Sequence, residues 1–211
     1  NINRTVTSTT LISSMQDVAT PHKPVDEQNH PQPWVAWNTS GAAGGIISSV
    51  DDMLKWMQLQ LNRGILNGDT LIVPALQKEM WTPHNNFMVS DEVSKLYGGR
   101  HFNGYGLGWS TTEYHGMHLV SHTGGYDGMY SAVVLLPGEK TGIVVLTNTM
   151  RSIGTMLCFE IIDKLMGFEQ GNWKERGIRQ GDNQLKNHAR QIKAIVDARV
   201  PGTQPTLKNS E

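Results

Sequence analysis

Four segments of alternating apolar and polar character follow one another in the second half of the chain. Short turn sequences join them, His115-Gly116 between the first two and 137–140 (PGEK) between the last two. A period of two predicts strands, and strands connected by such short turns pair antiparallel. The sequence therefore predicts an antiparallel meander over residues 105–114 (YGLGWSTTEY), 117–122 (MHLVSH), 129–137 (MYSAVVLLP) and 141–148 (TGIVVLTN).

Segments with a helical period lie before and after these strands. After a glycine-rich turn, Ser49 followed by Asp52 resembles a capping box, and Gly64 ends the helix that it opens. A second, short helix is expected at about 74–81, and a third, over 150–166, is expected to cover the sheet. The predicted core-facing residues are Val50, Leu54, Met57 and Leu61 in the first helix and Met150, Ile153, Leu157, Ile161 and Leu165 in the third.

The fold class that these patterns predict is α+β, an antiparallel sheet covered by a C-terminal helix together with a helical and loop-rich region. Residues 1–40 are rich in proline and polar residues. We therefore expect an irregular loop there, with Trp34 and Trp37 as its packing anchors. Residues 83–100 are expected to form a polar loop.

The chain is expected to comprise one domain over residues 1–168 and a helical arm or linker over 169–211 that leads toward a possible further module, with a frayed C-terminal tail as the alternative. Apolar residues at helical spacing predict one amphipathic helix in the arm. The chain starts at Asn1 rather than Met and ends in a linker-like sequence, so we expect a segment of a longer protein. The apolar residues of the arm are Leu185, Ala189, Ile192 and Val196.

The composition argues against several classes of function. The net charge of -1 and the pI of about 6.8 give no electrostatic basis for binding nucleic acid or an anionic membrane. No apolar run approaches the ~20 residues of a spanning helix. The single cysteine, Cys158, rules out a disulfide within the chain and is expected to be a buried thiol.

The segment 122–125 (HTGG) lies at the end of the second predicted strand and has groups that can line one side of a substrate-binding cleft, which is called the binding wall below. A strand end can present an imidazole and a hydroxyl, and glycines allow a substrate backbone to approach closely. An outward-pointing N–H of Gly125 would be half of an oxyanion hole, and loss of such a donor lowers a rate on the order of 10²–10³-fold. Tyr126 and Asp127 follow and are expected to form the rim, while a simple turn role fits Asp127 equally well.

The order of motifs resembles the C-terminal half of the serine β-lactamase and penicillin-binding-protein superfamily. The anchors are 105–109 (YGLGW), 122–125 (HTGG) and two strands divided by a Pro-Gly turn, while 44–56 (GGIISSVDDMLKW) resembles an upstream helix-opening segment. The resemblance covers roughly residues 1–170. The nearest branch is the group of class C β-lactamases, esterases and D-aminopeptidases that is often called CubicO-like, so the resemblance implies an incomplete β-lactamase/transpeptidase-like fold.

That superfamily works through an acyl-enzyme and three motifs, S-x-x-K, Y-x-N or S-x-N, and K-T-G. The resemblance implies that 122–124 is the third motif, with His in place of Lys. It implies catalytic roles for His122 and Thr123 and substrate-binding or oxyanion-binding roles for Gly124, Gly125 and Tyr126.

Neutral histidine lacks the permanent charge of lysine. An ester or a small amide is therefore expected as the substrate in preference to a β-lactam, although the expected class of substrates includes all three. The resemblance implies no cofactor, and it suggests an exported or periplasmic bacterial location.

The attacking residue is missing from this sequence. No lysine has a serine three positions before it, and no Tyr-x-Asn or Gly-x-Ser-x-Gly motif occurs. We expect the nucleophile in an N-terminal part of the same protein, which would be a partner of this chain, and we expect the chain alone to be inactive. The superfamily sheet takes further strands from that part, so 141–148 is expected to have a free, aggregation-prone edge.

Two other functions compete with the serine hydrolase. A chain with the binding wall but no nucleophile would suit a non-catalytic, penicillin-binding-like binding or sensor module. The histidines, His115 and His118 among them, suggest a metal-dependent hydrolase as a further hypothesis. No zinc motif accompanies them, and no metal site is predicted. Arg100 and Tyr105 are expected to have structural roles, with contact to substrate as the alternative.

Overall fold

A six-stranded antiparallel sheet, in the order β10-β9-β8-β7-β6-β5, is the centre of the molecule. The computed structural model describes residues 2–25, 28–36, 38–151, 153–169, 171–200 and 202. The expected meander is confirmed by the pairing of β7 with β8, β8 with β9 and β9 with β10. The strands are β5 (Asn85–Asn86), β6 (Asn103–Tyr105), β7 (Ser110–Tyr114), β8 (Met117–Tyr126), β9 (Met129–Leu136) and β10 (Thr141–Thr147).

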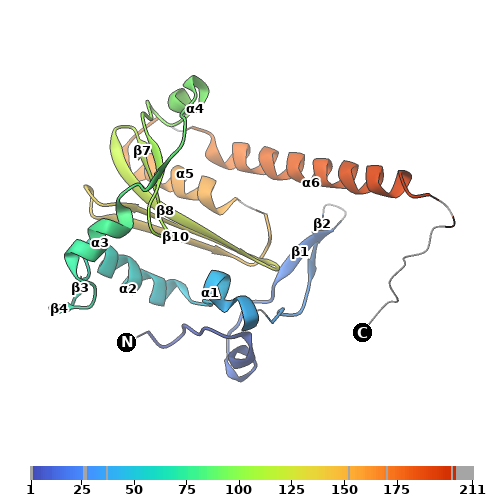
Figure 1. Cartoon of the computed structure of the whole chain (residues 1–211), viewed down its shortest axis with the longest axis horizontal. Coiled ribbons are helices and arrows are strands. Elements are labelled where there is room, and N and C mark those ends of the chain that lie inside the picture. The colour runs from blue at the N-terminus through green and yellow to red at the C-terminus, as the bar shows by residue number, and fades with distance from the viewer. Residues whose placement is uncertain are drawn as a thin grey trace.

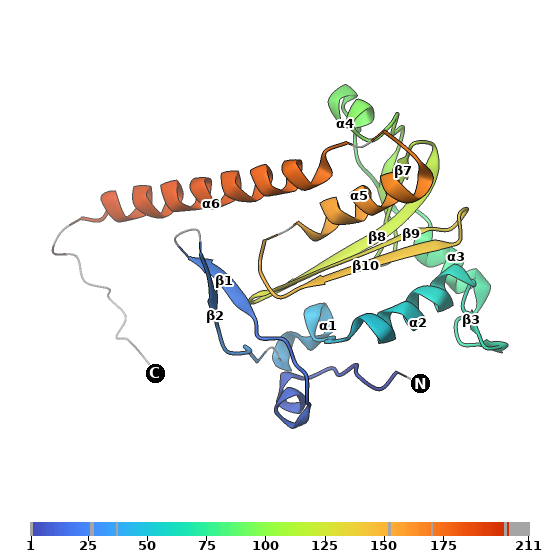
Figure 2. The ribbon, with the colours of Figure 1, turned by 180° about the vertical axis from the view of Figure 1, so that it is seen from behind.

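Helices cover both faces of this sheet, as Figures 1 and 2 show. Helix α5 (Gly154–Met166) packs on one face and α2 (Val50–Leu61) on the other. The α5 face buries Leu119, Ala132, Val134, Leu136 and Ile143, and the α2 face buries Trp109, Val120, Val133 and Leu135. The α+β class and the covering helix are thus confirmed, with a second helical layer on the far side.

Shorter elements complete the chain. The helical ones are η1 (Thr9–Ser14), η2 (Asn38–Ser40), α1 (Gly41–Gly44), α3 (Pro74–Trp81), α4 (Asp91–Leu96) and the long α6 (Trp173–Asp197). Two small hairpins are formed by β1 (His22–Val25) with β2 (Gln28–Pro31) and by β3 (Ile65–Leu66) with β4 (Asp69–Thr70). The short helix expected at 74–81 has these bounds in the structure.

The prediction of one strand over 105–114 is wrong. Strand β6 ends at Tyr105 and β7 begins at Ser110, with a bend between them. Gly106 allows the close approach, because a Cβ there would lie 2.3 Å from the carbonyl oxygen of Met80, and Gly108 has a φ of +79°. The alternating pattern therefore continues across two strands that pair with each other.

The prediction that residues 1–40 are irregular is also wrong in part, because β1 and β2 form a hairpin within the proline-rich stretch. Pro24 pairs with Asn29, and Pro31 pairs with His22, so both prolines occupy the same alternate class of pairs. One class in an antiparallel ladder makes no hydrogen bonds between its partners, and a proline is tolerated there. Trp37 lies outside the described residues.

Residues 83–100 are likewise not a plain loop, since they contain β5 and α4. Asn85 and Asn86 add a short edge strand to β6. Ser90 is the N-cap of α4, and its hydroxyl accepts a hydrogen bond from the N–H of Val93 at 3.3 Å. This polar segment was missed because its apolar residues are too few to reveal a period.

The predicted core faces of α2 and α5 need correction. Val50 and Leu54 are 46% and 44% exposed, whereas Met57 is buried and Met53 and Trp56 pack against the α2-face cluster. In α5 the exposed residues include Ile161 and Leu165, and the buried ones are Gly154, Cys158, Phe159, Ile162 and Asp163. Both helices carry apolar residues on more than one face, so the period alone could not select the face that packs.

A buried polar network joins α5 to the start of α6. The carboxylate of Asp163 accepts hydrogen bonds from the hydroxyl of Tyr114, from Nε1 of Trp173 at 2.8 Å and from the N–H of Gly171 at 3.1 Å. Burial and this carboxylate raise the pKa of Tyr114 above its ordinary value. Trp173 lies in the α5-face core although it follows the expected boundary at 168/169; the role of 169–211 as an arm toward another module stays a prediction.

Candidate active-site strand

The last third of β8 extends beyond its neighbour β7. The ladder between the two strands ends where Ser110 pairs with Ser121, while the ladder between β8 and β9 continues to Tyr126 opposite Met129. The predicted end of this strand at residue 122 is therefore wrong, because residues 122–126 lie inside β8. Among the described residues they pair with β9 alone, so one backbone edge of this segment is open.

The register sets which backbone groups face that open edge. A two-residue loop closes the β8–β9 hairpin after Tyr126, and the residues that close such a loop hydrogen-bond to each other. Because antiparallel pairs alternate, His122 and Gly124 bond to β9, while the N–H and C=O groups of Thr123 and Gly125 point toward the side where β7 has ended. The outward direction expected for the Gly125 N–H agrees with this register.

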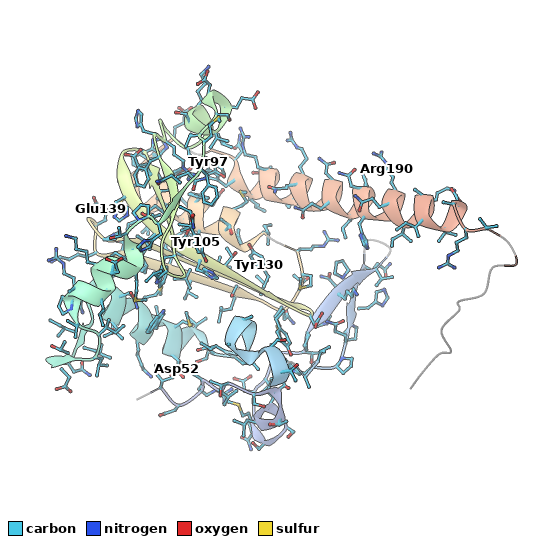
Figure 3. The ribbon with its side chains drawn as sticks, in the orientation of Figure 1. Asp52, Tyr97, Tyr105, Tyr130, Glu139 and Arg190 are labelled. Atoms are coloured by element: carbon cyan, nitrogen blue, oxygen red, sulfur yellow. The ribbon has the colours of Figure 1, made fainter. Side chains whose placement is uncertain are left out.

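His122 is held by a residue from two strands away. Its Nε2 lies 3.1 Å from the phenol oxygen of Tyr105 at the end of β6, and the two rings lie 6.4 Å apart. His122 is exposed and Tyr105 is half-buried, so both rings are reached from solvent. Figure 3 shows Tyr105 projecting over the sheet. A phenol and an imidazole in contact can orient each other and pass a proton.

The side chains of the predicted motif divide between the two faces of the sheet. His122 pairs with Val133 of the α2-face cluster, whereas Thr123 pairs with Ala132 of the α5-face cluster. Gly124 follows His122 on the α2 side, where a Cβ would lie 2.6 Å from Oγ of Ser131. Neighbouring strand residues alternate in this way, so the imidazole and the threonine hydroxyl point to opposite sides.

The N-terminal segment covers the tip of the β8–β9 hairpin. The hydroxyl of Tyr126 donates a hydrogen bond to the carbonyl oxygen of Val35, and the ring of Trp34 lies 6.2 Å from that of Tyr126. The N–H of His22 bonds to the carbonyl of Gly128 at 3.0 Å. Burial and the neighbouring Asp127 raise the pKa of Tyr126. This tyrosine is thus held in place at the rim of the open edge, beneath the packing anchor expected at Trp34.

The contact of Tyr105 with His122 was not predicted, because a structural role was expected for this tyrosine. Its contact with His122 depends on the pairing of three strands. In the sequence, only the short separation between 105–109 and 122–125 indicated that the two segments lie close together. Arg100 does have a structural position: its Nε donates to the carbonyl of Glu113 at 2.9 Å, and its guanidinium lies 3.9 Å from the ring centre of Tyr97.

The two histidines considered for a metal face different surroundings. His118 bonds to Oγ1 of Thr111 at 2.8 Å, and burial lowers its pKa, while His115 stacks on Phe168 at 4.2 Å. Within the described ranges, no three His, Cys, Asp or Glu residues are grouped so that they could hold a metal ion. The helices of the described part include none that is long and apolar enough to span a membrane.

Comparisons with known proteins agree with this architecture. The chain is 29% identical over 195 residues to the protein named unguisins hydrolase ungD' of Aspergillus campestris, which covers 88% of this chain and 33% of that protein. It is 31% identical over 113 residues to the protein flp of Staphylococcus aureus, covering 53% of this chain and 19% of that protein. The chain therefore spans about a third or less of the length of these relatives.

A solved structure and a family model extend the comparison. The octameric penicillin-binding protein homologue from Pyrococcus abyssi superposes with a TM-score of 0.66 at 23% identity, over 80% of this chain and 35% of that one, which shows a shared fold. The family model described as Beta-lactamase matches residues 2–156. That range contains the sheet, both strands of the β8–β9 hairpin and the open edge at 122–126, and we conclude that the chain belongs to the beta-lactamase family.

Proposed function

We propose that this chain supplies the substrate-binding wall of a serine hydrolase that works through an acyl-enzyme. The observation that carries the proposal is the open edge of β8 at residues 122–126, with His122 held by Tyr105 at 3.1 Å. An extended substrate can lie along such an edge, because main-chain groups there are available for hydrogen bonds. The family membership and the word hydrolase in the name of the Aspergillus relative support the class of reaction.

Each residue of the wall has a separate role in this proposal. The N–H of Gly125 holds the oxyanion, and the N–H and C=O of Thr123 position the substrate main chain. His122 orients the substrate or relays a proton on the α2 side, with Tyr105 as its positioning residue. Gly124 keeps that side open, and Tyr126 forms the rim.

The substrate class follows from the histidine. Lysine at this position would attract a substrate carboxylate with a permanent charge, and neutral imidazole gives a weaker attraction. We therefore propose an ester or a small amide as the preferred substrate, with β-lactams as poorer ones.

The nucleophile belongs, in this proposal, to a part of the protein outside these 211 residues. That part would also pair with the outer edge of β10, which among the strands of the described residues is paired with β9 alone. Exposed apolar residues on the outer side of α2 and nearby loops give it further surface to cover, namely Ile46, Val50, Leu54, Leu71 and Val73.

The test uses the full-length protein that contains these residues. Turnover of p-nitrophenyl acetate and nitrocefin is measured, and intact mass reports a covalent adduct with a slow substrate. We expect ester turnover, an acyl adduct, a loss of turnover in His122→Ala, and in His122→Lys a shift of preference toward nitrocefin, which carries a carboxylate. A full-length protein that turns over neither substrate and gains no adduct contradicts the proposal.

A non-catalytic binding module is the second candidate, because the open edge at 122–126 could bind an extended ligand without any chemical step. It predicts that a β-lactam or ester protects the full-length protein against thermal unfolding without any adduct. His122→Ala would then weaken this protection, while no product accumulates.

A further inference from the structure

The α5 side of Gly125 has room for a side chain that the residue does not carry. Gly125 is exposed and pairs with Tyr130 of β9, which packs against the α5-face cluster. Among the described residues, a Cβ built on Gly125 would have one atom within 4 Å, Cε of Met150 at 3.7 Å. That distance is an ordinary van der Waals contact, so the space beside the backbone is bounded by the tip of one flexible side chain.

Packing within the chain explains the neighbouring glycine but not this one. A Cβ on Gly124 would lie 2.6 Å from Oγ of Ser131, so a side chain does not fit there. Gly125 meets no such obstacle, and it does not have the positive φ that favours glycine. Glycine inside a strand costs stability relative to alanine, and it often marks a place that a ligand approaches closely. The free space at Gly125 therefore suggests that part of a substrate fills it.

Met150 is held on the other side of this space by the segment that leads to it. The hydroxyl of Thr147, at the end of β10, donates a hydrogen bond to the carbonyl oxygen of Tyr130 at 3.2 Å. The hydroxyl of Thr149 donates to Oδ1 of Asn29 at 3.1 Å. The Met150 side chain is 39% exposed, so its flexible thioether can pack against a group that enters from solvent.

The geometry of a β-ladder determines which part of a substrate would lie over Gly125. In an antiparallel pair, two residues that exchange N–H and C=O bonds lie directly opposite and direct their side chains to the same face. A substrate residue whose carbonyl oxygen accepts from the Gly125 N–H therefore directs its side chain to the α5 face. The leaving group after that carbonyl then runs past Thr123 toward His122. A parallel substrate would carry its leaving group toward Tyr126, away from the imidazole.

We propose that Gly125 and Met150 form the subsite for the side chain of the acyl residue, the residue whose carbonyl is attacked. An unbranched aliphatic side chain suits this subsite, because a thioether adapts to flexible chains and neither lining residue carries a charge. The outward C=O of Gly125 calls for an N–H on the same substrate residue. The preferred substrate is thus an ester or small amide of an N-acylated amino acid with such a side chain. This inference rests on the proposed hydrolase function and makes its substrate more specific.

The test measures kcat/KM of the full-length protein for the p-nitrophenyl esters of N-acetylglycine and N-acetylnorleucine. The ratio of the two values isolates the side chain, because the esters share their leaving group and main chain. We expect the norleucine ester to be preferred at least ~10-fold, since added methylene groups give selectivity of this order in an apolar site. Gly125→Ala fills the subsite with a methyl group, and the preference should fall at least ~10-fold.

Substitutions of Met150 test the other side of the subsite. Met150→Ala removes the surface on which the norleucine side chain packs, so the preference should fall ~3- to 10-fold, and Met150→Leu, which has a similar volume, should restore it. A purely structural role of Met150 would lower turnover of both esters equally and leave their ratio unchanged. Met88→Ala is the control, because Met88 is 96% exposed and lies outside the proposed subsite.

The outcomes separate the subsite from the hydrolase function. If the esters turn over and the ratio is the same in Gly125→Ala, Met150→Ala and the unmodified protein, the subsite is refuted while the hydrolase proposal stands. If neither ester turns over, the hydrolase proposal fails, and thermal protection by the amides of N-acetylnorleucine and N-acetylglycine tests the subsite instead. Stronger protection by the norleucine amide that Gly125→Ala removes supports the subsite, whereas equal protection by the two amides, or none, overturns it.

Discussion

The phenol oxygen of Tyr105 lies 3.1 Å from Nε2 of His122, although the two residues are 17 positions apart and on strands that are not neighbours. In Tyr105→Phe the ring remains but the hydrogen bond is lost. If the proposed hydrolase function holds, we expect kcat/KM of the full-length protein to fall by about 3- to 10-fold, the effect of one such bond, with most of the change in kcat. The ¹⁵N chemical shifts of the His122 ring should also change, because Nε2 loses its hydrogen-bond partner.

The matched control for that variant is Tyr130→Phe. The hydroxyl of Tyr130 lies 3.2 Å from Oγ1 of Thr155 in α5, away from His122. Equal effects of the two substitutions on kcat would show that Tyr105 acts only through stability.

Asp52 is expected to stabilise the fold near neutral pH and to make that stability decline in acid. Burial by itself would raise its pKa, but hydrogen bonds from the Arg4 N–H at 2.7 Å, from Lys55 at 3.1 Å and from Thr5 at 2.9 Å outweigh burial and lower the pKa to about 2. A lowered pKa contributes stability that is complete above the unfolded value of 3.8 and is lost as the pH falls toward 2. Urea unfolding at pH values from about 5 to about 2 measures this loss of stability.

Asp52→Asn should flatten that acid dependence, because an amide cannot titrate. Asp51→Asn is the control, since Asp51 is the exposed neighbour in the same first turn of α2. The pKa of an aspartate in the unfolded chain is about 4. If the stability of the Asp52→Asn protein still falls below that pH as steeply as the stability of the unmodified protein, this role of Asp52 is contradicted.

Cys158 should be protected from alkylation in the native protein. It is the single cysteine, it is fully buried in the α5-face core, and burial raises its pKa to about 12. Since the thiolate is the reacting species, iodoacetamide at pH 8 should modify the folded protein at least ~100-fold more slowly than the protein in urea. Intact mass measures both rates, and fast modification without urea would mean that α5 opens readily.

The same thiol makes stability decline in base. A raised pKa contributes stability that is complete below the unfolded value, 9.0 for this thiol, and is lost as the pH rises toward 12. Cys158→Ala should lessen the decline between these values, and unfolding midpoints across that range report it.

The 211-residue chain on its own should aggregate through β10. One edge of this strand has no partner within the described residues, and the strand is rich in valine and isoleucine. Leu146→Lys places a charge at a site that is 37% exposed on the edge strand and should suppress light scattering. Leu165→Lys, on α5 at 61% exposure, should not. Equal suppression by both variants would attribute the aggregation to general hydrophobicity.

The strands and their order were predictable because the signals that define them are local. His115 and Gly116 have φ values of 49° and 75°, which suit the tight hairpin between β7 and β8, and a Pro-Gly turn divides β9 from β10. The period of two between such turns determines a strand without reference to the rest of the chain. The capping hydroxyl of Ser49 is local in the same sense, and it accepts from the N–H of Asp52 at 3.4 Å.

Tertiary structure decided what the local signals left open. In α5, Ile161 and Phe159 are equally apolar in the sequence, and the aromatic cluster of Tyr114 and Trp173 selects Phe159 for burial. The open edge at 122–126 exists because β7 begins only at Ser110, and the partner of His122 comes from a third strand. Residues and turns specify the strands themselves, whereas contacts between distant segments specify which faces are buried and which groups meet.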